Sequence, residues 1–230
     1  MTPNDLRNSE EALMQEWYAE LERPKGFVFD GAMDASRYLG RGIPRILFIL
    51  KEAHSKHLKP WHLREYVLSK DCEWRTWNNV TRWKMLLDAL HEDPMLEPED
   101  FWREKLSWLS TADRNREMAD VAVMNLKKVP GKTRSYMKSI YAAAVLDKRR
   151  LQDQFDLLDP DVVVVCGPMP EYTPHLDQID QEWLHRSPEV QAVRVRYPDR
   201  ERVVIYTYHP QASVNAKGMV VGMARAVRSL

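Results

Sequence analysis

The chain has 230 residues, and its 34 basic and 34 acidic side chains give a formal net charge of zero. Zero net charge excludes a global basic field, so a polyanionic partner has to be held by a local patch. A hydrophobic content of 44% suffices for one well-filled core. We therefore expect a single domain over residues 1–230, in which residues 1–42 form an N-terminal helical cover.

The two cysteines, Cys72 and Cys166, are far apart in the chain and lack the spacing of metal ligands. This pattern speaks against a disulfide framework, a zinc site and an iron-sulfur cluster, so we expect no metal and no cofactor. The first residues lack a signal-peptide pattern, and no apolar run approaches the ~18 residues of a membrane span. We expect a soluble, cytoplasmic protein without a membrane partner, and we favour a monomer.

Helical patterns alternate with short apolar runs along the chain. Leu13, Trp17 and Leu21 stand at helical spacing within residues 9–23. Further helices are expected at residues 35–39, in a segment that ends near residue 93, from residue 97 onward, and at residues 135–158 and 216–230.

The apolar runs have the character of strands that are covered on both faces. They occupy residues 46–50, 121–124, 162–166 and 203–206, with a further edge strand expected at residues 193–196. Strands separated by helices indicate an α/β fold. We expect a three-layer αβα arrangement around a four-stranded, mostly parallel sheet.

A polar or small residue follows each of the four apolar runs. These residues are Glu52, Asn125, Gly167 and His209. Because the carboxyl ends of parallel strands meet at one edge of a sheet, where catalytic groups collect, we expect all four to converge on one site.

A carboxylate, a carboxamide and an imidazole around one cleft suit the hydrolysis of an N-glycosidic bond. Glu52 would stabilise the oxocarbenium-like sugar and orient the attacking water, and a donor from His209 would stabilise the departing anionic base. Asn125 carries a donor and an acceptor that can read a pyrimidine edge. Purely structural roles remain open: a carbonyl partner for His209, a Lys51 or Lys56 partner for Glu52, and a loop cap for Asn125.

Four blocks of the chain, in this order, resemble the uracil-DNA glycosylase superfamily. The blocks are Leu50-Lys51-Glu52-Ala53-His54, Val123-Met124-Asn125-Leu126-Lys127-Lys128, residues 161–167, and His209-Pro210-Gln211-Ala212-Ser213. The resemblance spans most of residues 45–230. It implies a four-stranded parallel sheet flanked by helices, base flipping, and a monofunctional DNA glycosylase without a cofactor.

The resemblance also implies roles for individual residues. Glu52 and His209 would be catalytic, and Asn125 would bind the base. Base contacts are expected from Lys51, His54, Ser55 and Trp77, and DNA contacts from Gln211 and Ser213. Trp77 stands where the thermophile-type branch carries a stacking Phe, although an ordinary core Trp is an equal alternative.

Departures from the family pattern narrow the expected substrate. The cluster cysteines of the thermophile-type branch are missing, Lys51 replaces a Gly, and His54 replaces a Pro. Ser55 is small where the best-known members place a Tyr that blocks substituents on carbon 5 of the pyrimidine. We therefore favour a 5-substituted or glucosylated cytosine of phage DNA as the substrate, with uracil next. Antiviral defence and DNA repair use the same chemistry.

A local excess of basic residues predicts a phosphate-binding face. The residues closest to the expected site are Lys127, Lys128, Lys132 and Arg134. Two other classes of function stay open: a non-catalytic nucleic-acid-binding protein of the same fold, and an enzyme that acts on free nucleosides or nucleotides. The eight glycines include no Gly-rich phosphate loop, which speaks against the second.

Overall fold

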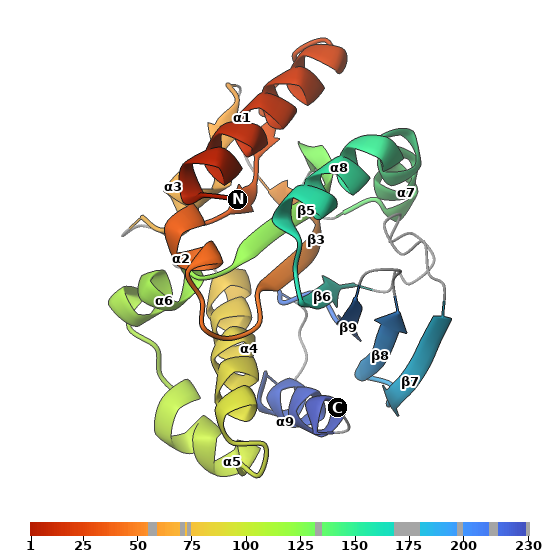
Figure 1. Cartoon of the computed structure of the whole chain (residues 1–230). Coiled ribbons are helices and arrows are strands. Elements are labelled where there is room, and N and C mark those ends of the chain that lie inside the picture. The colour runs from red at the N-terminus through yellow and green to blue at the C-terminus, as the bar shows by residue number, and fades with distance from the viewer. Residues whose placement is uncertain are drawn as a thin grey trace.

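The computed structural model describes residues 1–54, 59–69, 72, 75–131, 135–167, 180–196, 200–211 and 216–228. Its largest feature is a seven-stranded sheet with helices on both sides (Figure 1). The strands stand in the order β2 (Gly31–Ala32), β5 (Ala122–Gly131), β3 (Ile46–His54), β6 (Val162–Cys166), β9 (Glu201–Thr207), β8 (Val190–Arg196) and β7 (Asp180–Arg186). A separate two-stranded parallel sheet joins β1 (Val28–Phe29) to β4 (Trp61–His62).

The four middle strands, β5, β3, β6 and β9, run parallel to one another. Leu47 in β3 pairs with Ala122 on one side and with Val163 on the other. Because helices cover both faces, these strands carry apolar residues in succession instead of alternating with polar ones. The predicted mixed α/β class, with a mostly parallel central sheet flanked by helices, is confirmed.

Three additional strands make the sheet larger than the four strands predicted. β2 pairs antiparallel with β5, β8 pairs antiparallel with β9, and β7 pairs antiparallel with β8. The edge strand predicted at residues 193–196 is the second half of β8, but β7 lies outside it. β7 is polar and has a bulge between Trp183 and His185, so its sequence lacks an apolar run that would reveal it. Residues 1–42 are not purely helical, because they supply β1 and β2.

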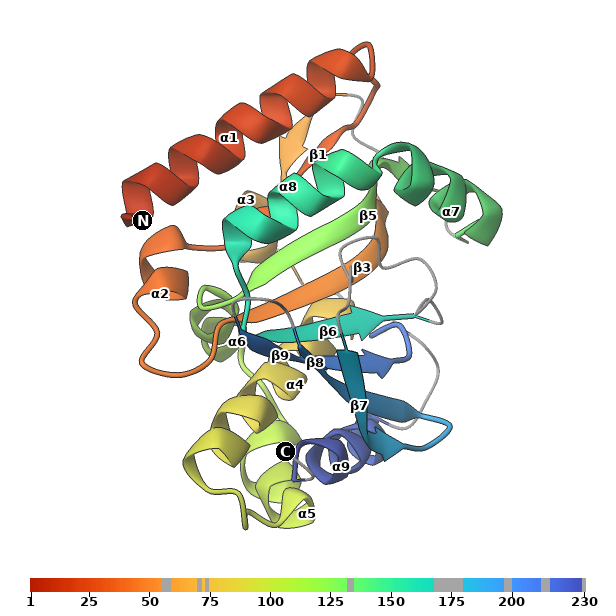
Figure 2. The same cartoon turned by 45° about the vertical axis from the view of Figure 1, so that its right-hand side comes forward.

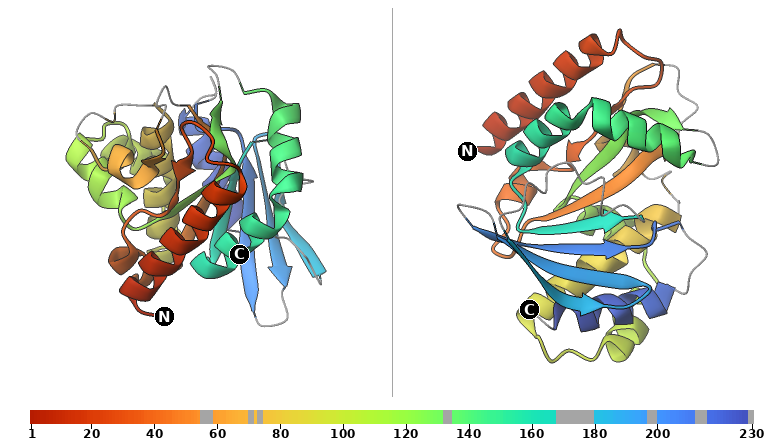
Figure 3. Two further views of the ribbon diagram at one scale, coloured as in Figure 1. Left: turned by 90° about the horizontal axis from the view of Figure 1, so that it is seen from above. Right: turned by 90° about the vertical axis from the view of Figure 1, so that its right-hand side faces the viewer.

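The helices form two layers around the sheet (Figures 2 and 3). They are α1 (Pro3–Glu20), α2 (Ala35–Leu39), α3 (Leu63–Val67), α4 (Arg75–Glu92), α5 (Pro98–Phe101), η1 (Trp102–Leu106), α6 (Thr111–Met118), α7 (Met137–Leu146), α8 (Lys148–Leu158) and α9 (Ala216–Val227). Leu47 and Ile49 of β3 face α1, α7 and α8, whereas Phe48 and Leu50 face α4, α6 and α9. The core is therefore divided in two by the sheet.

Two helices differ from the expected ranges for local reasons. The first helix begins at Pro3 because Thr2 and Asp5 form a capping box, with the Asp5 amide donating to the Thr2 hydroxyl. The single helix predicted over residues 135–158 is divided into α7 and α8 at Asp147, where φ is −95° and ψ is 14°. Within the described ranges, no helix is long and apolar enough to span a bilayer.

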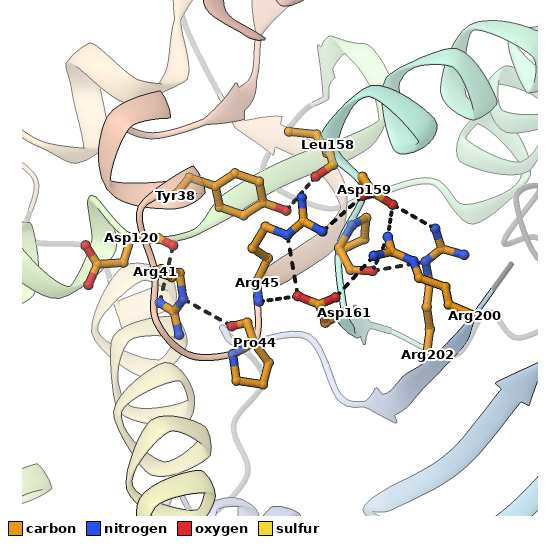
Figure 4. A network of polar contacts seen from close by, with 11 residues as sticks. Tyr38, Arg41, Pro44, Arg45, Asp120, Leu158, Asp159, Asp161, Arg200 and Arg202 are labelled. Atoms are coloured by element: carbon orange, nitrogen blue, oxygen red, sulfur yellow. Dashed lines mark hydrogen bonds and ion pairs between the residues drawn. The ribbon is translucent and has the colours of Figure 1, made fainter. Parts of the chain in front are cut away.

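A network of ion pairs joins the amino ends of β3, β6 and β9 (Figure 4). The Arg45 amide donates to Asp161 Oδ2 at 2.8 Å, and Arg45 Nη2 lies 3.0 Å from Asp159 Oδ2. Arg200 pairs with both carboxylates, and Arg202 Nη2 lies 3.0 Å from Asp159 Oδ1. Ion pairs between two carboxylates and three guanidinium groups thus link the amino ends of three strands.

Candidate active site

A cavity lies at the opposite end of the sheet, beside the carboxyl-terminal halves of β3 and β5 and the end of β9. Its lining consists of Leu50, Glu52, Ala53, His54, Trp61, Leu63, Tyr66, Thr76, Trp77, Asn125, Ser135, His209 and Gln211. Most of the site residues predicted from the sequence that the structure describes therefore meet in one place.

Several predicted residues are not part of this lining. Gly167 does not line the cavity, because β6 ends at Cys166 while β3 and β5 continue. Gly167 lies beside the aliphatic part of Lys51. Lys51 itself is also outside the lining. Four predicted residues fall outside the described ranges: Ser55, Lys132, Arg134 and Ser213.

Glu52 and Asn125 lie within strands, which corrects the expectation that they follow them. β3 continues to His54 and β5 to Gly131, and Leu50 pairs with Asn125 in this extension. The polar side chains end the apolar run, but the backbone pairing of β3 with β5 continues beyond it. The extension brings the side chains of neighbouring strands to the same cavity.

The carboxylate of Glu52 is held inside the protein by Lys127. Lys127 Nζ lies 2.6 Å from Glu52 Oε2, and the Glu52 side chain is 3% exposed. A side chain at Gly131 would overlap this carboxylate, so the absence of a Cβ there makes room for Glu52. The partner of Glu52 among the described residues is thus Lys127, whereas the sequence suggested Lys51 or Lys56, and Lys56 lies outside the described ranges. The phosphate contact predicted for Lys127 stays a prediction.

The orientation of the Asn125 carboxamide is fixed by Asp30. Asp30 Oδ2 accepts from the Asn125 amide at 2.8 Å and from Asn125 Nδ2 at 2.9 Å. A carboxylate without a proton only accepts hydrogen bonds, so the nitrogen of the carboxamide must face Asp30. Asn125 Oδ1 is buried and has no hydrogen-bond partner within the part of the chain that the structure describes. The site therefore contains a buried acceptor that a ligand can satisfy.

Lys128 is wrongly predicted as a phosphate ligand. Its side chain is fully buried, and its Nζ lies 2.6 Å from Asp30 Oδ1, 2.8 Å from Gln154 Oε1 and 4.9 Å from the centroid of the Trp17 ring. Burial lowers the pKa of Lys128, whereas the charge of Asp30 acts in the opposite direction. Lys128 supports the site from behind and does not reach its surface.

His209 follows β9 and is held in a defined orientation. The Gln211 amide donates to His209 Nδ1 at 3.2 Å, and Asn79 Nδ2 of α4 donates to the Pro210 carbonyl at 2.7 Å. Burial, assisted by the nearby charge of Lys51, lowers the pKa of His209 to about 4. At neutral pH the imidazole is therefore uncharged. Because Nδ1 accepts a hydrogen bond, the proton is on Nε2, which can donate.

Three aromatic side chains line the cavity. Trp77 of α4 is 5% exposed and packs in the core, so it is at once a core residue and part of the lining. Trp61 and Tyr66 contact each other edge to face, with ring centroids 5.8 Å apart. Trp61 and Tyr66 were not predicted from the sequence as site residues. The aromatic content of residues 61–66 was the available signal, but only the pairing of β1 with β4 brings this segment to the site.

A mainly apolar cavity lies elsewhere and lacks such chemistry. It measures about 250 Å³ and is lined mainly by Ile46, Leu87, Leu90, Val162, Val203, Ile205 and Val227. The acidic residue at its margin, Asp88, is already paired with Arg41 and Lys84. The cavity at Glu52, Asn125 and His209 is the better candidate, because it combines buried polar groups with aromatic walls.

Comparison with known proteins gives no family. A scan against protein-family models found no match, and neither did a search of curated proteins. Among the described residues, no group of three or more His, Cys, Asp and Glu is placed to hold a metal ion.

Proposed function

We propose that the protein is a monofunctional DNA glycosylase of the uracil-DNA glycosylase type, which hydrolyses the N-glycosidic bond of a pyrimidine and leaves an abasic site. The observation that carries the proposal is the meeting of Glu52, Asn125 and His209 in one aromatic-walled cavity. These residues come from three of the four blocks that resemble the superfamily, and β5, β3, β6 and β9 supply the parallel sheet that the resemblance implies.

His209 suits the leaving group. A pyrimidine departs as an anion with charge on its carbonyl oxygen, and the neutral His209 ring offers a donor at Nε2. A neutral donor keeps its proton when it stabilises an anion, and one well-placed donor of this kind contributes about 3–4 kcal/mol to the barrier. His209 thus acts by stabilising charge, without transferring a proton.

Glu52 suits the sugar. Its carboxylate lies in the cavity, where it stabilises the positive charge that develops on the sugar and orients a water molecule for attack. Lys127 holds this carboxylate at 2.6 Å, which fixes its position before the substrate binds. Preorganisation of this kind lowers the cost of reaching the transition state.

The aromatic walls and Asn125 suit the flipped base. Trp61, Tyr66 and Trp77 offer surfaces for stacking, and Asn125 Oδ1 accepts from an N–H group on the base. The preference for a 5-substituted or glucosylated cytosine over uracil rests on Ser55 of the sequence. Phage DNA is then the partner and antiviral defence the setting, with repair of uracil as the second possibility. We further propose that the protein acts as a monomer in the cytoplasm.

The test is a panel of single-stranded and duplex oligonucleotides that contain uracil, 5-hydroxymethylcytosine or glucosylated 5-hydroxymethylcytosine. Abasic sites are revealed by alkali cleavage, with His209→Gln as the inactive control. We expect abasic sites in a substrate with a 5-substituted cytosine and their loss in the variant. Release of uracil alone would remove the preference for modified cytosine. If no oligonucleotide of the panel acquires abasic sites, the proposal of a glycosylase is rejected.

A further inference from the structure

A second layer of polar residues lies behind the cavity, and this layer determines how the Asn125 carboxamide of the lining is oriented. Asp30 accepts four hydrogen bonds, two at each carboxylate oxygen. At Oδ1 the donors are Lys128 Nζ at 2.6 Å and Gln154 Nε2 at 2.8 Å, and at Oδ2 both donors belong to Asn125. Asp30, Lys128 and Gln154 are all buried and come from three separate segments. Both oxygens of the Asp30 carboxylate thus accept their hydrogen bonds from groups within the protein.

This arrangement leaves Asn125 only one way to face the cavity. A carboxamide has a donor side and an acceptor side, and rotation by 180° about χ2 exchanges them. Rotation here would place Oδ1 against the Asp30 carboxylate, so that two acceptors would face each other. The Asp30 carboxylate is buried together with the Lys128 ammonium, whose Nζ lies 2.6 Å from Oδ1, so the pair holds the carboxylate in place. Asn125 therefore presents Oδ1 to the ligand.

We infer that Asp30 is a positioning residue that fixes Asn125 with its carboxamide oxygen toward the cavity, so that the site binds pyrimidines through an N–H donor on the base. The inference rests on the proposed function and defines its substrate class. The amino group of cytosine derivatives and the ring N–H of uracil satisfy it. A pyrimidine whose only N–H groups carry methyl substituents leaves Oδ1 buried without a partner, which is unfavourable.

The test measures binding without cleavage. The probes are single-stranded oligonucleotides with one 2′-fluoro-arabino pyrimidine nucleotide, whose N-glycosidic bond resists hydrolysis. Each probe comes as a pair: uracil with 3-methyluracil, and cytosine with N4,N4-dimethylcytosine. For the wild-type protein we expect the methylated member of at least one pair to bind about tenfold more weakly or worse, as measured by fluorescence anisotropy.

Asp30→Asn provides the decisive comparison, because an asparagine at this position can donate to Asn125 Oδ1 and lets the carboxamide rotate. The ratio of affinities within the pair should fall toward one. Asp30→Asn leaves the Lys128 charge buried, so the double variant Asp30→Asn/Lys128→Met removes both charges together. The matched control is Lys84→Met/Glu117→Gln, which removes another largely buried ion pair away from the cavity and should keep the ratio of the wild type.

Each outcome decides the matter. The inference is overturned if the wild type binds both members of every pair equally, or binds neither. It is also overturned if both Asp30 variants keep the wild-type ratio of affinities between unmethylated and methylated probes. A ratio lost in the Asp30 variants and kept in the Lys84 control supports it. The result is separate from cleavage: discrimination here, together with silence in the glycosylase assay, would reject the enzyme while the role of Asp30 stands.

Discussion

The two ends of the central sheet carry similar residue types and use them differently. At the amino ends, the carboxylates of Asp159 and Asp161 meet the guanidinium groups of Arg45, Arg200 and Arg202 across three strands (Figure 4). At the carboxyl ends, polar groups line a cavity, and among the described residues Asn125 Oδ1 has no hydrogen-bond partner while His209 carries its proton on Nε2.

The difference teaches how to tell a structural cluster from a site. Ionisable residues at strand ends occur at both edges, so their presence alone is not diagnostic. At the amino end two carboxylates pair with three guanidinium groups, and these ion pairs contribute to stability. At the carboxyl end Asp30 and Lys127 hold Asn125 and Glu52 from behind. Substitutions of the residues that line the cavity should therefore lower activity, whereas substitutions in the amino-end network should lower stability alone.

The largest effect on stability is expected from the support behind the cavity. Lys128→Met leaves the Asp30 carboxylate buried without its ion pair. Removal of one partner of a buried pair costs about 3–5 kcal/mol of the free energy of unfolding, which urea denaturation measures. Arg116→Met is the control, because Arg116 and its partner Asp113 are both exposed and the loss of this pair should cost less. Equal small losses in both variants would contradict the buried support.

The largest effect on activity is expected from His209. His209→Gln should lower kcat/KM for glycosidic cleavage by about 10²–10³-fold, because one donor to the departing base is lost or misplaced. The free energy of unfolding should change little, since the ring is only half-buried and accepts one hydrogen bond. Arg200→Lys, at the amino end, is the control that should retain activity. Comparable activities of the two variants would remove the distinction between the two ends.

A smaller effect, on stability alone, is expected at the amino end. Asp161→Ala removes the acceptor of the Arg45 amide and one partner of Arg200. Because Asp161 is 38% exposed, solvent screens these interactions, and we expect a loss of about 1–2 kcal/mol in thermal or urea denaturation. The kcat/KM of the folded protein should equal that of the wild type. A selective loss of activity would place this network in the catalytic machinery.

A pH dependence of stability is expected between the two pKa values of His209. The pKa is about 4 in the folded protein and 6.5 when unperturbed, so the unfolded chain binds the proton first as the pH falls. The contribution of neutral His209 is complete above pH 6.5 and is lost as the pH falls toward 4. The wild type should lose more stability over this range than His209→Gln. An NMR titration midpoint of His209 near 6.5 would contradict this.

Local sequence patterns predicted the middle of the fold well. The four apolar runs are the four parallel strands, because burial on both faces leaves a continuous apolar signature. β2 has only two residues and β7 is polar, so neither has a signature of its own. Each exists because a neighbouring strand offers an open edge. The break between α7 and α8 at Asp147 was equally invisible in the helical periodicity.

Part of the cavity lining was predicted from the sequence, but the residues that support it were not. Glu52, Asn125 and His209 were found because each follows an apolar run. Asp30 was missed, because nothing local connects it to Asn125 far along the chain. Lys128 was misread because a lysine in a basic stretch suggests the surface, and only the position of Asp30 explains its burial. The local sequence pattern does not reveal which charged residues pair across long distances in the chain.

The central position of β3 has a consequence for the synthesis of the protein. Leu47 pairs with Ala122 and Ile46 pairs with Val162, so the ribosome completes β3 long before either neighbour exists. At about 5–20 residues per second, this apolar strand waits unpaired for several seconds. Such non-local pairing slows folding and leaves an apolar, aggregation-prone segment exposed to other nascent chains. The strand that carries Glu52 is therefore also the segment for which chaperones matter most during translation.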